Sequence, residues 1–304
     1  MNIRQTLGLI AAAAAVAQLR RKVIGRSLTT WTPPGGEIRN AGLSVRVLGD
    51  GEPRIVLLHG MFNAGTYWGG AYDVLAGDGQ LLVPDLLGFG RSPRPTSGYT
   101  PDDHADAVAD TLRAVGVRSP VIVGGHSVGS VVALRLAVKH PDLVAGLVAI
   151  APPLYPDIAT AERRVAGTDP LARLLLANEN LGRRLCDWMC RYPRAASLLV
   201  RMVRPSMPSA LADDRVRHSW VSYSETLSTV LIRSGASAWL DEVDVPVRLI
   251  AGSNDTAVEL GFLQELTTSH LNVEIRIVDG AGHDLPLSHP DICLEEVGRM
   301  QDGR

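Results

Sequence analysis

The chain has few cysteines: Cys186, Cys190 and Cys293 are the only three among its 304 residues. An odd and sparse set of this kind provides no disulfide framework. Cys186 and Cys190 lie four positions apart in a stretch of helical character, which could supply half of a metal site. No histidine or cysteine partner of metal-like spacing lies nearby. We therefore expect two buried thiols on one helix face, and no metal site.

A strong charge of either sign is also absent. The net charge is −2 and the isoelectric point about 6.4, so no overall basic field points to nucleic acid as a partner. Hydrophobic residues make up 46% of the chain and charged residues 20%, as in soluble proteins with a sizeable core. The length suits one α/β domain with an insertion, or two small domains.

The N-terminus carries an apolar run that is too short to span a bilayer comfortably as a helix. It extends from Leu7 to Ala17 and is followed by the basic cluster Arg20-Arg21-Lys22. Three interpretations stay open: a cleaved secretory signal ending in an A-x-A site, a membrane-surface helix within residues 1–25, or a packed helix or loose tail. Together they favour a secreted or membrane-associated protein over a cytoplasmic one.

The order of strand-like and helix-like segments predicts the domain organisation. From Glu37 to Ile150 short apolar strands alternate with helices, which indicates a mostly parallel sheet with helices on both faces. We predict an N-terminal segment and linker over residues 1–36, and an α/β core over 37–151 and 242–304. Residues 152–241 are helical in character and predict a cap over the carboxyl edge of the sheet, where active loops gather.

The sequence does contain a serine in a favourable place for chemistry. Residues 125–129 read Gly-His-Ser-Val-Gly, after an apolar strand and before a helical run. In that context a G-x-S-x-G match predicts a nucleophile elbow, whose sharp turn projects Ser127 outward and whose glycines avoid a collision. Helix N–H groups would then lie near the serine oxygen. The plainer alternative is a strand-to-helix turn with a serine N-cap.

A serine nucleophile needs a base and an acid in suitable loops. His283 lies in a glycine-rich loop after the last predicted strand, and Asp255 follows the strand before it. The order Ser127, Asp255, His283 is that of α/β-hydrolase triads. Asp157, after the strand that precedes the predicted cap, is the rival acid. Asp284 lies beside the histidine, and we expect it to point away.

The developing oxyanion needs preorganised donors, each worth roughly 3–4 kcal/mol in one measured precedent. The backbone N–H of Val128, directly after the nucleophile, is the first candidate. The second is the backbone N–H of Met61, in the loop that follows His59-Gly60. Because backbone groups serve here, the side chains at both positions are free to be apolar.

Several motifs in a fixed order resemble the α/β-hydrolase superfamily. His59-Gly60 is similar to its oxyanion motif, and residues 85–92 (Asp-Leu-Leu-Gly-Phe-Gly-Arg-Ser) closely resemble its D-x-x-G-x-G-x-S loop. The resemblance covers the chain from about Glu37 to Met300, except the predicted cap. It implies an eight-stranded sheet with an antiparallel second strand, an acyl-enzyme mechanism, and no metal or organic cofactor. Ser127 stands where related dehalogenases and epoxide hydrolases place an aspartate, so we do not expect those activities.

The predicted cap should decide the choice of substrate. The candidates for lining a pocket are apolar and aromatic side chains, which suit an apolar acyl or aryl group: Phe62, Tyr67, Trp68, Trp188 and Trp220. The alternative is that they pack the core. Arginines of the cap could hold a carboxylate, although a solvated face is the commoner use.

The leading hypothesis is a serine hydrolase that cleaves carboxylic ester bonds of small to medium apolar substrates. A carbon–carbon bond hydrolase or a cofactor-free perhydrolase of the same fold is the alternative among enzymes. A ligand receptor or pseudoenzyme is the alternative outside enzymes, although a pure binder has no need of Ser127, Asp255 and His283 together. The partner expected is a small-molecule ester.

Overall fold

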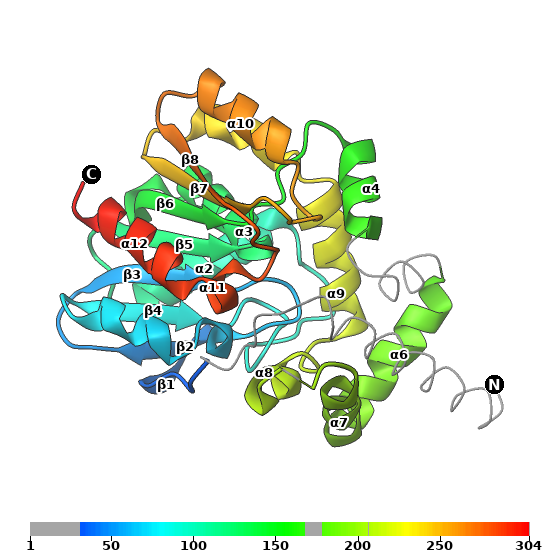
Figure 1. Cartoon of the computed structure of the whole chain (residues 1–304). Coiled ribbons are helices and arrows are strands. Elements are labelled where there is room, and N and C mark those ends of the chain that lie inside the picture. Colours follow the sequence, from blue (N-terminus) through cyan, green and yellow to red (C-terminus); the bar gives the residue numbers. More distant parts are fainter. Residues whose placement is uncertain (1–30, 168–177, 206, 304) are drawn as a thin grey trace.

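The protein is built around one eight-stranded sheet (Figure 1), in a computed structural model that describes residues 31–167, 178–205 and 207–303. The strand order is β1-β2-β4-β3-β5-β6-β7-β8. The strands are β1 (Glu37–Ala41), β2 (Leu43–Leu48), β3 (Pro53–Leu58), β4 (Gln80–Pro84), β5 (Val121–His126), β6 (Val144–Ile150), β7 (Val247–Gly252) and β8 (Val273–Val278). Strand β2 runs antiparallel to both neighbours, whereas β3 to β8 pair in parallel. The predicted sheet, with its antiparallel second strand, is confirmed.

Helices cover both faces of this sheet, as predicted. Those of the sheet-forming parts of the chain are η2 (Gly65–Trp68), η3 (Gly70–Ala76), α2 (Pro101–Ala114), α3 (Val128–Lys139), η4 (Pro141–Leu143), α10 (Leu260–Ser269), α11 (Leu285–Ser288) and α12 (Pro290–Gln301). The sequence favours a helix start at α2: Thr100 caps it, Pro101 takes the first position and Asp103 completes a capping box.

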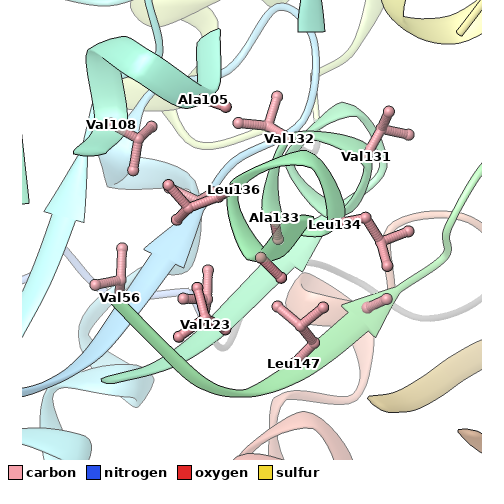
Figure 2. Close-up of a cluster of buried hydrophobic side chains, with 14 of the residues drawn as sticks. Val56, Ala105, Val108, Val123, Val131, Val132, Ala133, Leu134, Leu136 and Leu147 are labelled. Carbon is pink, nitrogen blue, oxygen red and sulfur yellow. The ribbon is translucent and has the colours of Figure 1, made fainter. Parts of the chain in front are cut away.

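Alternate residues of the central strands point into two separate cores. Val56, Val123 and Leu147 face α2 and α3, and Figure 2 shows their side chains meeting Val108 and Leu136 of those helices. On the other face, isoleucines and leucines of the same strands pack against α12 and the short helices. Burying each such side chain contributes about 1.5–3 kcal/mol, so the sheet is a rigid support for the loops at its edges.

Between β6 and β7 the chain leaves the sheet and forms a helical insertion. Its described elements are α4 (Ile158–Gly167), α6 (Glu179–Arg191), α7 (Pro193–Val203), α8 (Ser209–Asp214), α9 (Trp220–Thr226), the π-helix η5 (Leu227–Ile232) and η6 (Ala236–Glu242). Met61 and Phe62, in the loop after β3, pack against Tyr223 and Leu227 of the insertion. The insertion therefore lies at the carboxyl edge of the parallel strands, on one side of the sheet in Figure 1.

The segment before β1, predicted as part of a linker, is bonded to the domain. The Trp31 indole donates to the carbonyl of Thr66 at 3.2 Å, and the backbone N–H of Gly70 donates to the carbonyl of Thr32 at 2.8 Å. The backbone N–H of Gly35 donates to the Asp73 carboxylate at 2.6 Å. Within the described ranges no helix is both long and apolar enough to cross a membrane. The predicted membrane-surface segment, residues 1–25, lies outside them.

Candidate active site

Ser127 occupies the turn between β5 and α3 in a strained backbone conformation. Its φ of 53° and ψ of −119° are rare for a residue with a side chain. The turn is closed by the backbone N–H of Ser130, which donates to the Ser127 carbonyl at 2.9 Å. Side chains at Gly125 and Gly129 would collide with backbone atoms of neighbouring segments. The predicted elbow geometry is therefore present, with the Ser127 hydroxyl at the amino end of α3.

The structure brings Ser127, His283 and Asp255 together in one hydrogen-bonded chain. Nε2 of His283 lies 3.0 Å from Oγ of Ser127, and Nδ1 lies 2.8 Å from Oδ2 of Asp255. The Asp255 side chain is fully buried, whereas that of His283 is 33% exposed. Since the carboxylate accepts from Nδ1, the Nε2 lone pair is free to accept the serine proton. This arrangement can transfer a proton from hydroxyl to imidazole.

Burial and the Asp255 carboxylate act in opposite directions on His283. Burial lowers the pKa of the imidazole, but the hydrogen bond to Asp255 and the charge of that carboxylate raise it. The net effect places the pKa of His283 above its ordinary value of 6.5. The ring is thus a stronger base than a free histidine, and its protonated form is stabilised when it takes up a proton.

The loop after β3 passes directly beside the nucleophile. A Cβ atom added at Gly60 would lie 3.2 Å from the Ser127 Cβ and 2.9 Å from Nδ1 of His126. Both ring nitrogens of His59 contact backbone atoms near this loop: Nε2 accepts from the backbone N–H of Leu86 at 2.9 Å, and Nδ1 lies 2.8 Å from the Gly60 carbonyl. The structure therefore places Gly60, the residue before Met61, beside Ser127.

A second layer of polar groups supports the loop of His283. Nε2 of His126 lies 3.0 Å from the His283 carbonyl, and the ring of Tyr67 stacks on the His126 ring at a centroid distance of 4.9 Å. The Tyr67 hydroxyl donates to the Asp284 carboxylate at 3.0 Å. Burial raises the pKa of Asp284, but the charges of Arg215 and the two histidines and the Tyr67 hydrogen bond bring it below the ordinary value. Asp284 thus accepts from Tyr67 and stays ionised.

The predicted pocket residues fall into three groups. Tyr67 and Trp68 are each 1% exposed; they pack in the core, so the prediction that they line a pocket is wrong. Trp188 is 37% exposed on the outer side of α6. Phe62 and Trp220 do lie together, in the apolar cluster that joins the loop after β3 to the insertion. Phe62 contacts the Tyr223 ring at a centroid distance of 4.9 Å, a partner that the sequence did not indicate.

The remaining candidates are placed away from this centre. Asp157, the rival acid, accepts the backbone N–H of Thr160 at 2.7 Å, at the start of α4. Sγ of Cys186 lies 3.6 Å from Nε2 of His218, and the Cys190 thiol donates to the His218 carbonyl at 2.6 Å. Cys186 is buried as expected, but Cys190 is exposed, which corrects half of that prediction. Within the described ranges, no three ligating side chains group as a metal site.

Comparison with known proteins links this geometry to a family. The probable lysophospholipase BODYGUARD 4 of Arabidopsis thaliana is 27% identical over 253 residues, which cover 77% of this chain and 60% of the plant protein. The chain thus spans less than two thirds of that relative. An uncharacterized protein of Mycobacterium bovis, Mb2734, is 26% identical over 270 residues, covering 84% of this chain and 77% of the relative.

Solved structures show the same fold. The crystal structure of E-2-(acetamidomethylene)succinate hydrolase matches with a TM-score of 0.69 and 22% identity, covering 88% of this chain and 99% of that one. The model of the alpha/beta hydrolase fold family matches residues 53–290, which include all three residues of the hydrogen-bonded chain. The protein therefore belongs to the alpha/beta hydrolase fold family.

Proposed function

We propose that this protein is a serine hydrolase that cleaves carboxylic esters of small to medium apolar substrates through an acyl-enzyme. The observation that carries the proposal is the unbroken hydrogen-bonded chain from Asp255 through His283 to Ser127 at a strained turn. A serine hydroxyl becomes an effective nucleophile only beside an oriented base, and this geometry supplies one. No metal or organic cofactor enters the proposal.

In the proposed first half-reaction Ser127 attacks the ester carbonyl while His283 takes its proton. The Asp255 carboxylate stabilises the imidazolium that forms. The backbone N–H groups of Val128 and Met61 hold the oxyanion; this assignment is supported by the position of Val128 at the start of α3 and by the close passage of Gly60 beside Ser127. His283 then returns the proton to the departing alcohol.

In the second half-reaction water attacks the acyl-enzyme. His283, neutral again, takes a proton from the water, and collapse of the intermediate releases the acid and restores the Ser127 hydroxyl. The apolar side chains of Met61, Phe62 and Trp220 pack against the apolar cluster of the insertion. They support an apolar acyl or aryl group as the preferred substrate, because their burial leaves few polar partners there.

The test is hydrolysis of p-nitrophenyl esters of increasing acyl length by the wild-type protein and Ser127→Ala. We expect turnover to fall by roughly 10³-fold or more in the variant. Ser269→Ala is the matched control, since that exposed serine only donates to a helix carbonyl of α10. A fluorophosphonate should transfer its phosphonyl group to the wild type, with loss of fluoride, but not to Ser127→Ala. A folded protein without turnover on any ester would refute the esterase proposal, and labelling at another residue would refute the assignment of Ser127.

A further inference from the structure

Two consecutive helices of the insertion turn large apolar side chains toward solvent. In α6 and at its end these are Leu181, Trp188 and Tyr192, which are 37%, 37% and 49% exposed. In α7 Leu198 and Met202 are 58% and 60% exposed. Half of the exposed large hydrophobic residues in the described ranges therefore fall within 22 positions, whereas the others are scattered. Such clustering marks an interaction surface, because single exposed apolar residues need no explanation.

The apolar positions form stripes with helical spacing. Leu181 and Trp188 are seven residues apart, and Leu198 and Met202 are four apart, so each pair shares one side of its helix. The opposite sides of the two helices pack inward through Cys186 and Ala196, which are 3% and 1% exposed. The outward stripes are therefore a separate apolar surface in addition to the buried seam.

Arginines surround these stripes. From Glu179 to Arg204 the chain contains six arginines but only two acidic residues, whereas the whole protein carries a net charge of −2. Three exposed arginines flank the stripes, because each lies three or four positions from a stripe residue: Arg184, Arg191 and Arg194. The Arg191 guanidinium lies 5.9 Å from the centroid of the Tyr192 ring, beside the exposed aromatic residues. An apolar patch bordered by cations suits a partner whose surface is anionic and whose interior, just beneath that surface, is apolar.

We propose that this α6–α7 face, made of the five apolar residues and the three flanking arginines, binds the surface of an anionic lipid bilayer. The apolar side chains enter the boundary between headgroups and acyl chains, and the guanidinium groups pair with lipid phosphates. Trp188 and Tyr192 suit this depth, because their rings are apolar with one polar atom. Figure 1 shows α6 and α7 projecting from the body of the protein, beyond the core helices.

Other partners fit the same face less well. In a symmetric dimer each patch meets its own copy, which would bring the three arginines of both chains together. A nucleic acid would leave the five apolar side chains against a polar backbone. An anionic bilayer offers an apolar interior to the apolar side chains and negatively charged headgroups to the arginines. Because the insertion lies at the edge that holds Ser127, docking would also bring lipid esters to the site; this last clause rests on the proposed function, whereas the binding does not.

The experiment is sedimentation of the full chain with phosphatidylcholine vesicles, with and without phosphatidylglycerol. We expect binding to require the anionic lipid and to weaken with salt. Leu198→Glu/Met202→Glu should weaken binding about tenfold or more, since two apolar side chains that the bilayer would bury are lost. Leu271→Glu, at a fully exposed leucine outside the face, is the control and should bind as the wild type does. Unchanged hydrolysis of a soluble ester by the double variant shows that its fold is intact.

Brominated lipids test whether this face is the one that enters the bilayer. They should quench part of the tryptophan emission, and Trp188→Phe should remove the quenched component. Ser127→Ala should bind like the wild type, which separates docking from catalysis. Binding without quenching of Trp188 would place the contact elsewhere in the chain and overturn the proposal. So would equal binding of the double variant and Leu271→Glu, or a lipid-independent dimer that the double variant abolishes.

Discussion

Tyr67 and Asp284 stand 217 positions apart in the chain, yet a 3.0 Å hydrogen bond joins the Tyr67 hydroxyl to the Asp284 carboxylate beside His283. Burial, followed by the charge of Asp284, raises the pKa of Tyr67 well above 10.0, so its hydroxyl remains a donor at all ordinary pH values. The same tyrosine ring stacks on His126, which bonds to the His283 backbone. The pair thus connects the loop of the candidate base to the sheet.

Tyr67→Phe should destabilise the protein because it leaves the Asp284 carboxylate without that donor. A hydrogen bond to a charged group contributes about 1.5–3 kcal/mol, and we expect the free energy of unfolding to fall by this amount in urea titrations. Tyr192→Phe is the matched control, at a tyrosine that is 49% exposed; its effect should stay within about 0.5 kcal/mol. Equal midpoints for the two variants would contradict the structural role given to Tyr67.

The pH dependence of hydrolysis should report the raised pKa of His283. The base acts in its neutral form, so kcat/KM should increase as pH rises through a midpoint above 6.5. Asp255→Asn replaces the carboxylate, whose charge raises the pKa, with a neutral amide, whereas the lowering effect of burial remains. We therefore expect the midpoint to move to lower pH and kcat to fall roughly 10⁴-fold. The pH–rate profile of a p-nitrophenyl ester measures both.

Asp157→Asn is the control for that measurement, because Asp157 precedes α4 and does not contact His283. Its profile should match that of the wild type. A midpoint that shifts in Asp157→Asn but not in Asp255→Asn would reverse the assignment of the acid.

The sequence predicted the three candidate catalytic residues because each lies in a loop that follows a strand. Ser127, Asp255 and His283 each follow a parallel strand of the sheet, and parallel strands bring their carboxyl ends to one edge; the triad geometry follows from that order. The sequence could not decide where Tyr67 and Trp68 lie, because an aromatic pair after a loop has the same sequence pattern whether it lines a pocket or packs in a core. Only the tertiary packing against Leu211 and Leu287 decides that Tyr67 is buried.

The insertion was less predictable, for a different physical reason. Its helical character could be inferred, but which helix side faces the sheet depends on contacts between distant segments. The pairing of Phe62 with His218 and Tyr223 is of this kind. The outward stripes of α6 and α7 share the helical spacing of a buried face, so periodicity alone could not assign Trp188 to the surface.

Gly60→Ala should impair hydrolysis more than it impairs folding. The added Cβ would lie 2.9 Å from Nδ1 of His126 and 3.2 Å from the Ser127 Cβ, so one of these side chains must move. A small displacement of a nucleophile costs about 10²-fold in rate, and we expect kcat to fall by that order. Gly298→Ala is the control: it meets no atom within 4 Å in α12 and should stabilise the protein by about 0.5–1 kcal/mol. A kcat equal to that of the wild type in Gly60→Ala would show that the loop accommodates the added methyl group, and would contradict this prediction.

Phe62 combines a left-handed backbone conformation, φ 61°, with a ring that contacts the insertion. Glycine adopts this φ without strain, whereas alanine does not. We therefore expect Phe62→Gly to be at least as stable as Phe62→Ala, although glycine in a regular helix costs about 1 kcal/mol more than alanine. Both variants lose the ring, so the difference between them isolates the backbone. Urea unfolding of the two variants measures it.

Phe262 provides the matched pair, since it lies within α10, where the backbone is regular. Phe262→Gly should be less stable than Phe262→Ala by about 1 kcal/mol, so the order of stabilities reverses between the two positions. Both Phe62 variants should also raise KM for longer acyl esters more than for acetate, because the ring borders the apolar cluster beside the nucleophile. The same order of stabilities at both positions would show that the backbone at Phe62 is unstrained, and equal KM changes would remove Phe62 from the substrate site.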